Sequence, residues 1–258
     1  MKRFVLPVLL LIFTQSVFAT SQEIAQSFLI ERHSLQAKKI EKGLTQAFMI
    51  STPTLDLASL EIVSETLAPG ATTKKRKNAE THEELLIVFE GQLQINGDKQ
   101  QYGPGSVMVN MPGEKRRFTN AGDAAASYYL FRYRSHNAPN PQRAKKAGGS
   151  ILLNWDEIDY MPSDIGGRRN FFDRPTAMFD TFEMHVSTLN GGLTNHPAHT
   201  HRAEEFVLIM EGRVAMLLGE KTVEAGAGDL IYVESMIPHS LNNIGKEATT
   251  YFAFQFWQ

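Results

Sequence analysis

The chain contains one sequence layout twice, and this internal repeat limits its fold more than any other feature. Residues 82–112 and 203–238 each run from a Glu-Glu pair through an apolar stretch to Glu-Gly, then to a glycine corner and a second apolar stretch. Four landmarks keep their spacing: Glu84 and Glu205, Gly91 and Gly212, Gly105 and Gly228, and Asn120 and Asn243. Two copies about 120 residues apart indicate two domains of one kind rather than a short-period solenoid.

Most of the chain has the composition of β strands. Stretches rich in β-branched and aromatic residues, separated by turn residues, span 182–189, 206–212, 213–218, 229–235 and 249–256. Many short, evenly spaced strands indicate a sandwich or barrel, and the duplication predicts two of them. Near the N-terminus, residues 22–41 place Ile24, Phe28, Leu35 and Ile40 roughly on one side of a helix, so we predict a short helix there.

The first nineteen residues are typical of a secretory signal peptide. Lys2 and Arg3 precede an apolar run, and the small residues Val17 and Ala19 follow it. A membrane anchor is the alternative, but the run is short for a span of about 20 residues and contains Pro7. We therefore predict cleavage after Ala19 and a periplasmic or secreted protein. The chain has no cysteine, so its stability depends on its core rather than on disulfides.

The charge balance limits the partners of this chain. With 26 basic and 28 acidic residues the net charge is -2, which gives no reason to expect nucleic-acid binding or, after signal cleavage, membrane binding. A Pro- and Gly-rich basic stretch at 135–149 is typical of an exposed linker. We expect this division: signal peptide 1–19, N-terminal segment 20–54, first barrel 55–135, linker and connecting strands 136–177, and second barrel 178–258.

The second copy opens with the histidine-rich stretch "HTHRAEEF", residues 199–206. Alternate residues of a strand share a face, so His199, His201 and Glu205 should project together, with Val207 and Ile209 as apolar lining. Imidazole nitrogens and carboxylate oxygens are ligands for divalent transition metals.

A fourth ligand is available after a turn-forming proline, at His239. The alternative is a cluster of solvated polar side chains at a strand edge. Because these residues lead into an apolar run, unpartnered polar groups there would be costly. We predict one divalent metal ion held by His199, His201, Glu205 and His239.

These residues resemble the two motifs of the cupin family. The pattern H-x-H-x3-E-x6-G followed by G-x(n)-H-x3-N matches at His199, His201, Glu205, Gly212, Gly228, His239 and Asn243. The chain departs from it in turn residues: Gly192 precedes the first histidine by seven positions, and Gly226 replaces the proline of the second motif. The resemblance implies two tandem cupin barrels (double-stranded β-helix, or jelly-roll), with the four ligands inside the second.

The first copy lacks the histidines. Its expected equivalents of the four ligands are Asn78, Glu80, Glu84 and Arg116. An arginine side chain cannot lose its proton and is no ligand, but Arg116 could neutralise Glu80 or Glu84. A makeshift metal site of Glu80, His82 and Glu84 is the alternative. We expect the first barrel to be a structural or interface partner.

The predicted site leaves coordination positions free for water or substrate, and Mn, Fe, Ni and Zn all suit its ligands. As acid–base helpers we select His185 and Tyr232, and Arg168 and Arg169 could bind a carboxylate or form an exposed pair in a loop. The partner is a small molecule. A homodimer is possible, and the aromatic residues at 251–257 would suit its packing.

The overall plan is similar to the (S)-ureidoglycine aminohydrolase family, through "YYLFRYRSHNAP" (128–139) and "MFDTFEMHVSTLNGG" (178–192). That resemblance implies Mn as the metal, although the ligand pattern of the family differs from the one in this chain. Three classes of function stay open. They are a non-redox hydrolase, isomerase or decarboxylase for a small carboxylate or ureide, an Fe- or Ni-dependent dioxygenase, and a non-catalytic binding protein for a small ligand or sugar.

Overall fold

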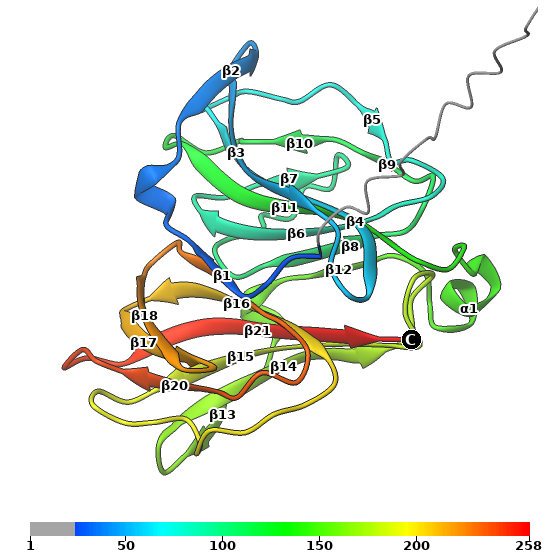
Figure 1. The fold of residues 1–258 in the computed structure, drawn as a ribbon. Coiled ribbons are helices and arrows are strands. Elements are labelled where there is room, and N and C mark those ends of the chain that lie inside the picture. Colours follow the sequence, from blue (N-terminus) through cyan, green and yellow to red (C-terminus); the bar gives the residue numbers. More distant parts are fainter. Residues whose placement is uncertain (1–23) are drawn as a thin grey trace, which may run out of the picture.

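The computed structural model describes residues 24–258, so the predicted signal peptide at 1–19 lies outside the described residues. The described chain is mostly β, as predicted, and its two largest sheets each have seven strands (Figure 1). None of its helices is long and apolar enough to cross a membrane.

The N-terminal sheet consists of β2 (Ala37–Glu41), β3 (Leu44–Thr52), β4 (Leu57–Leu67), β6 (Glu83–Glu90), β8 (Val107–Asn110), β11 (Ala126–Ser135) and β12 (Ile151–Leu153). The C-terminal sheet consists of β1 (Phe28–Ile30), β13 (Met161–Ser163), β14 (Gly166–Arg174), β15 (Thr181–Leu189), β16 (Glu204–Glu211), β19 (Leu230–Val233) and β21 (Thr249–Trp257). We call residues 37–135 the N-terminal half and residues 161–257 the C-terminal half.

Smaller elements complete each half. The N-terminal half also has β5 (Arg76–Lys77) paired with β9 (Lys115–Arg116), and β7 (Gln94–Ile95) paired with β10 (Phe118–Thr119). The C-terminal half has a three-stranded sheet of β17 (Arg213–Leu218), β18 (Lys221–Gly226) and β20 (His239–Asn243). Helix α1 (Pro141–Lys146) and two 3-10 helices, η1 (Arg32–Ser34) and η2 (Trp155–Glu157), are the helical segments of residues 24–258.

The two large sheets have the same strand order and exchange a strand. The orders are β12-β8-β6-β11-β4-β3-β2 and β1-β19-β16-β21-β15-β14-β13. Strand β1 precedes the N-terminal half but pairs with β19, and β12 precedes the C-terminal half but pairs with β8. The internal repeat therefore extends over nearly the whole described chain.

The predicted N-terminal helix is wrong. Phe28, Leu29 and Ile30 form β1, with Phe28 opposite Tyr232 and the two ring centroids 5.1 Å apart. Hydrogen bonds to the edge of the C-terminal sheet and this aromatic packing outweigh a weak local helical pattern, as tertiary context commonly does.

Alternate residues of the central strands divide between three cores. In β16, Val207 and Ile209 point into the C-terminal half, whereas Phe206 and Leu208 join the core between the two large sheets, as their spacing predicts. That shared core is aromatic: Phe131 meets Phe254 with centroids 5.4 Å apart. A third core fills the N-terminal half.

The stretch at 135–149, expected as an exposed linker, is mostly unburied, but the chain from α1 to β14 is attached to both halves. Asn140 caps α1 by accepting from the Arg143 backbone N–H at 2.9 Å, and the Arg143 side chain donates to the carbonyls of Thr176 and Ala177. Strand β12 joins the N-terminal sheet, and β13 and β14 join the C-terminal sheet.

Most of the aromatic residues at 251–257 lie inside this chain. Tyr251, Phe252, Phe254 and Phe256 are buried, whereas Trp257 is 37% exposed. Four of the five aromatic residues thus pack within the chain, and the homodimer stays a prediction.

Glycines close the corresponding turns after β6 and β16. Gly91 and Gly212 have φ of 70° and 86°, a region in which other residues are strained. A Cβ on Gly91 would lie 2.5 Å from the Ala125 carbonyl oxygen, and one on Gly212 would lie 2.8 Å from Thr249. Both landmark glycines of the repeat are thus required by backbone shape and by close packing.

Candidate metal centre

Three histidines meet at one end of the C-terminal half. His199 and His201 precede β16, and His239 begins β20. Backbone hydrogen bonds tie His199 to His239 in both directions, at 3.2 and 3.0 Å. One ring nitrogen from each of the three lies within 4.8 Å of the others, and among residues 24–258 this is the one histidine, cysteine or carboxylate cluster that close.

Glu205, the second residue of β16, faces the same point. Its Oε2 lies 3.5 Å from His201 Nε2 and 3.4 Å from His239 Nε2. The alternation of the strand brings Glu205 inward beside Val207, as the sequence predicts. The four predicted ligand residues are therefore brought together.

Hydrogen bonds to backbone carbonyls fix the tautomers of two of the rings. His201 Nδ1 donates to Ala203 O and His239 Nδ1 donates to Ile237 O, both at 2.9 Å. Because a carbonyl only accepts, the proton sits on Nδ1 and the Nε2 lone pair is free for a metal ion. His239 Nε2 is buried and has no hydrogen-bond partner, which is the state expected of a metal ligand.

The charges at this point also suit a cation. Without a metal ion, burial raises the pKa of Glu205, but hydrogen bonds from His201 and His239, which need a proton on Nε2, outweigh it and lower that pKa to about 2. A metal ion bound at Nε2 would take the place of these protons beside the ionised carboxylate. Burial, followed by the neighbouring His196, lowers the pKa of His199 and keeps its ring neutral at pH 7. Three imidazole nitrogens and one carboxylate form a donor set that fits Mn, Fe, Ni or Zn.

The cluster lines a cavity of about 430 Å³ between the C-terminal sheet and the small sheet opposite it. His185 on β15 lines this cavity, and its Nδ1 lies 2.8 Å from Glu183 Oε1. Arg168 on β14 lines it too and donates to the same oxygen at 2.8 Å. The cavity thus holds a histidine oriented by a carboxylate, beside an arginine.

Two other candidates lie elsewhere. Tyr232 is fully buried on the opposite face of β19, where its hydroxyl donates to Glu204, so the structure does not bring it to the site. Arg169 also points away, with its guanidinium 4.6 Å from the Trp155 ring centroid. Alternation along each strand determines both outcomes, since Tyr232 and Arg169 neighbour residues that face inward.

The cavity wall includes residues that the sequence motifs did not single out. Tyr251 and Gln255 on β21 line it, and Gln255 pairs with Glu205 across the strands. Both residues have odd numbers, so alternation along β21 indicates that they share a face. Only the pairing with β16 shows that this face turns toward the candidate metal ligands.

The N-terminal half has arginines at the corresponding positions. Arg76 pairs with Arg116 in the way that His199 pairs with His239. The expected equivalence of Asn78 with His199 is therefore wrong by two residues, because the segment before β6 is two residues longer than the one before β16. By this register Asn78 corresponds to His201.

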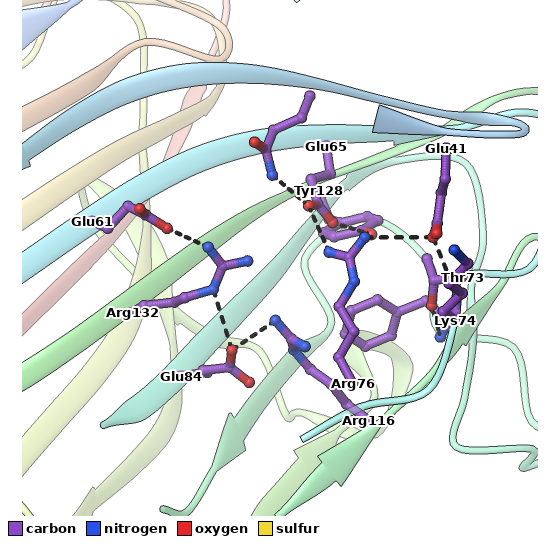
Figure 2. A network of polar contacts seen from close by, with 12 residues as sticks. Glu41, Glu61, Glu65, Thr73, Lys74, Arg76, Glu84, Arg116, Tyr128 and Arg132 are labelled. Carbon is purple, nitrogen blue, oxygen red and sulfur yellow. Dashed lines mark hydrogen bonds and ion pairs between the residues drawn. The ribbon is translucent and has the colours of Figure 1, made fainter. Parts of the chain in front are cut away.

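Glu84 keeps the place of Glu205 but contacts a guanidinium (Figure 2). Arg116 Nη2 lies 2.6 Å from Glu84 Oε1, and both side chains are buried. Of the two partners predicted for Arg116, Glu80 and Glu84, it therefore contacts Glu84. Glu80 instead pairs with Lys77 and is 72% exposed. The makeshift metal site of Glu80, His82 and Glu84 does not form.

Comparison with known proteins identifies part of the chain. Residues 185–254 match the family model described as the cupin domain. This segment contains all four candidate ligands together with His185. No curated protein sequence matches this chain.

Solved structures resemble the chain along nearly its whole length. A glyoxylate-induced protein of Pseudomonas aeruginosa is 16% identical, with a TM-score of 0.70 over 94% of this chain and 93% of its own. The YlbA protein of E. coli is 18% identical, with a TM-score of 0.69 over 93% and 95%. Oxalate decarboxylase of Bacillus subtilis, which has Mn(II) centres, is 14% identical, with a TM-score of 0.68 over 92% and 78%. At these identities the comparisons establish the fold alone.

Proposed function

We propose that this chain is an exported bicupin metalloenzyme that acts on a small carboxylate or ureide by non-redox chemistry. One divalent metal ion binds to His199, His201, Glu205 and His239 in the C-terminal half. The observation that carries the proposal is the convergence of these four side chains, with the His239 Nε2 buried and unpartnered. If nothing bound to these donors, that buried nitrogen would stay without a partner, which costs free energy.

Three further observations support the remaining parts of the proposal. The shared strand order of the two large sheets supports two cupin barrels. The charged and apolar start of the sequence supports export after cleavage at Ala19. The Mn(II) centres of a structural neighbour support Mn as the metal.

The cavity supplies the groups that a hydrolase, isomerase or decarboxylase needs. When bound, the metal ion would polarise a carbonyl or carboxylate oxygen or activate water. Glu183 accepts from His185 Nδ1, which leaves Nε2 to take up and return a proton. Arg168 is half exposed at the cavity and can orient a substrate carboxylate.

Elemental analysis of the purified protein tests the metal site. We expect about one equivalent of metal in the wild type and a loss of most of it in His201→Ala, because a direct ligand is removed. His196→Ala is the matched control, since His196 also lines the cavity but lies outside the ligand cluster, and it should keep its metal. The absence of metal from the wild type, even after reconstitution, would contradict the proposal.

The identity of the metal separates the classes of reaction. Mn or Zn would support non-redox chemistry, whereas Fe or Ni with oxygen consumption would favour a dioxygenase instead. Turnover should then be measured on a panel of small carboxylates and ureides. His185→Ala should lower it by about 10²- to 10⁴-fold without loss of metal, and unchanged turnover in this variant would remove His185 from the reaction.

A further inference from the structure

A second cavity lies in the N-terminal half, around the residues that replace the metal ligands. Its volume is about 490 Å³, and its wall includes Arg76, Arg116, Arg132, Glu84 and His82. Figure 2 shows Arg116 and Arg132 reaching Glu84 from two sides. The two halves therefore place cavities at corresponding sites, one lined by histidines and the other by arginines.

Arg116 has an unused donor. Its side chain is 4% exposed and contacts Glu84 through Nη2, but its Nε–H is buried and has no hydrogen-bond partner. Among the described residues, three buried side-chain atoms lack a partner, and the others are Gln101 Oε1 and His239 Nε2. Arg116 and His239 occupy corresponding positions of the repeat, so each cavity is lined by a residue with one unpartnered polar atom.

The buried charges around Arg116 are only partly matched. Arg116 and Arg132 share one buried carboxylate, that of Glu84, at 2.6 and 3.4 Å. Arg132 also pairs with Glu61, which lines the cavity as well, but that carboxylate is 42% exposed, so solvent screens it. His82 adds no negative charge, and burial, followed by the nearby Arg134, lowers its pKa so that it stays neutral.

The other two cations at the wall are matched from outside it. Arg76 lies 3.4 Å from Glu65 and from Glu41, and Lys77 pairs with Glu80. None of these three carboxylates lines the cavity. The free donor capacity of the cavity therefore belongs to Arg116 and Arg132.

We propose that the N-terminal half binds a small organic carboxylate between Arg116 and Arg132, without a metal ion. Two guanidinium groups stay charged at any physiological pH, and their planar N–H pairs match the two oxygens of a carboxylate. The carboxylate then supplies an acceptor beside the Arg116 Nε–H and a further acceptor for Arg132, whose partly exposed side chain already pairs with Glu84 and Glu61. The site is separate from the proposed metal centre and does not depend on it.

Calorimetric titration of the mature chain tests this site. The protein carries His199→Ala and His201→Ala and is treated with EDTA, which removes metal-dependent binding in the other half. Acetate, malonate and benzoate are the probes. We expect at least one of them to bind, and Glu84→Leu/Arg116→Met to weaken that binding at least tenfold. This double substitution removes the buried pair together and so avoids leaving an unpaired charge.

Two further variants keep the test decisive. Arg132→Gln changes a side chain that is partly exposed, and it should also weaken binding at least tenfold even if the double variant does not fold. Arg213→Gln removes an exposed cation of the C-terminal half and should leave the affinity unchanged. The proposal is overturned if none of the three probes binds, or if Arg132→Gln binds them as tightly as the background protein. Such a result leaves the proposed metal site untouched, because these titrations contain no metal.

Discussion

The two halves of this chain differ most in the residues that face the glutamate shared by both copies of the repeat. Both place a glutamate on the second residue of a central strand, facing a cavity: Glu84 is buried and Glu205 is half-buried. In the C-terminal half His199 and His239 stand opposite, with lone pairs for a metal ion, and in the N-terminal half Arg76 and Arg116 take their places. One scaffold thus faces the same carboxylate with the donors of the proposed metal site in one half and with a cation of its own sequence in the other.

The junction between the halves is more symmetric. Glu204 accepts hydrogen bonds from the Leu55 and Asp56 backbone N–H groups, which lie before β4 of the other half. Glu83 accepts from those of Ala177 and Met178, before β15 of the other half. Each half therefore fixes a loop of its partner with a buried carboxylate.

The largest difference in unfolding free energy between the halves should appear when the partner of Glu84 or of Glu205 is removed. Arg116→Ala leaves Glu84 buried with only the longer contacts to Asn110 and Arg132, at 3.3 and 3.4 Å, and should cost about 3–5 kcal/mol of unfolding free energy. In metal-free protein, His239→Ala should cost less than about 2 kcal/mol, because Glu205 keeps His201. Urea unfolding of both variants measures this, and equal costs would show that the Arg116 pair contributes no more than an ordinary core contact.

Glu83 should make the stability of the protein depend on pH. Burial raises the pKa of Glu83 from 4.5 to about 7, with hydrogen bonds only partly opposing it. The folded state therefore holds the proton of the Glu83 carboxyl more tightly than the unfolded state does. The protonated Glu83 stabilises the fold fully below pH 4.5, and this stabilisation is lost as pH rises through 7.

The loss amounts to about 3.5 kcal/mol at most, because the shift from 4.5 to about 7 spans about 2.5 pKa units and each unit is worth about 1.4 kcal/mol. Glu83→Gln, which keeps the shape of the protonated group, should remove this pH dependence, whereas Glu204→Gln should leave it in place. Thermal unfolding between pH 5 and 8 is the measurement, and a profile unaffected by Glu83→Gln would refute the assignment.

The exchanged strands predict that damage appears in the opposite half. Phe28→Ala removes the half-buried ring that packs on Tyr232, and should cost about 2 kcal/mol. Its effect on hydrogen exchange should be strongest in β19, whereas Ile151→Ala should affect β8. The prediction would be contradicted if Phe28→Ala lowered hydrogen-exchange protection mainly in the N-terminal half, or Ile151→Ala mainly in the C-terminal half.

The smallest effect concerns a pair present in one half only. Arg213 and Glu224 lie 2.8 Å apart, with 68% and 64% of their side chains exposed. The landmark spacing places Gln92 at the position of Arg213 in the first copy. Arg213→Gln should therefore change the unfolding free energy by less than about 1 kcal/mol, as double-mutant cycles find for exposed pairs. A loss of several kcal/mol in urea unfolding would contradict this.

The sequence by itself determined the repeat, the strands and the group of four candidate ligands. Strand alternation was sufficient for Glu205 and Val207, because a period of two assigns faces without knowledge of the neighbours. Stretches of β-branched and aromatic residues between turn residues located the five predicted strands of the C-terminal half, which the structure confirms.

Only the tertiary structure decided which segments are paired. The local pattern around Phe28 favoured a helix, and nothing nearby in sequence could reveal that β19 offers a free strand edge about 200 residues away. The alignment of Asn78 failed for a related reason: an insertion before β6 changes the count along the chain but not the register across the strands. Pairing between distant strands depends on hydrogen bonds and packing that local sequence does not encode.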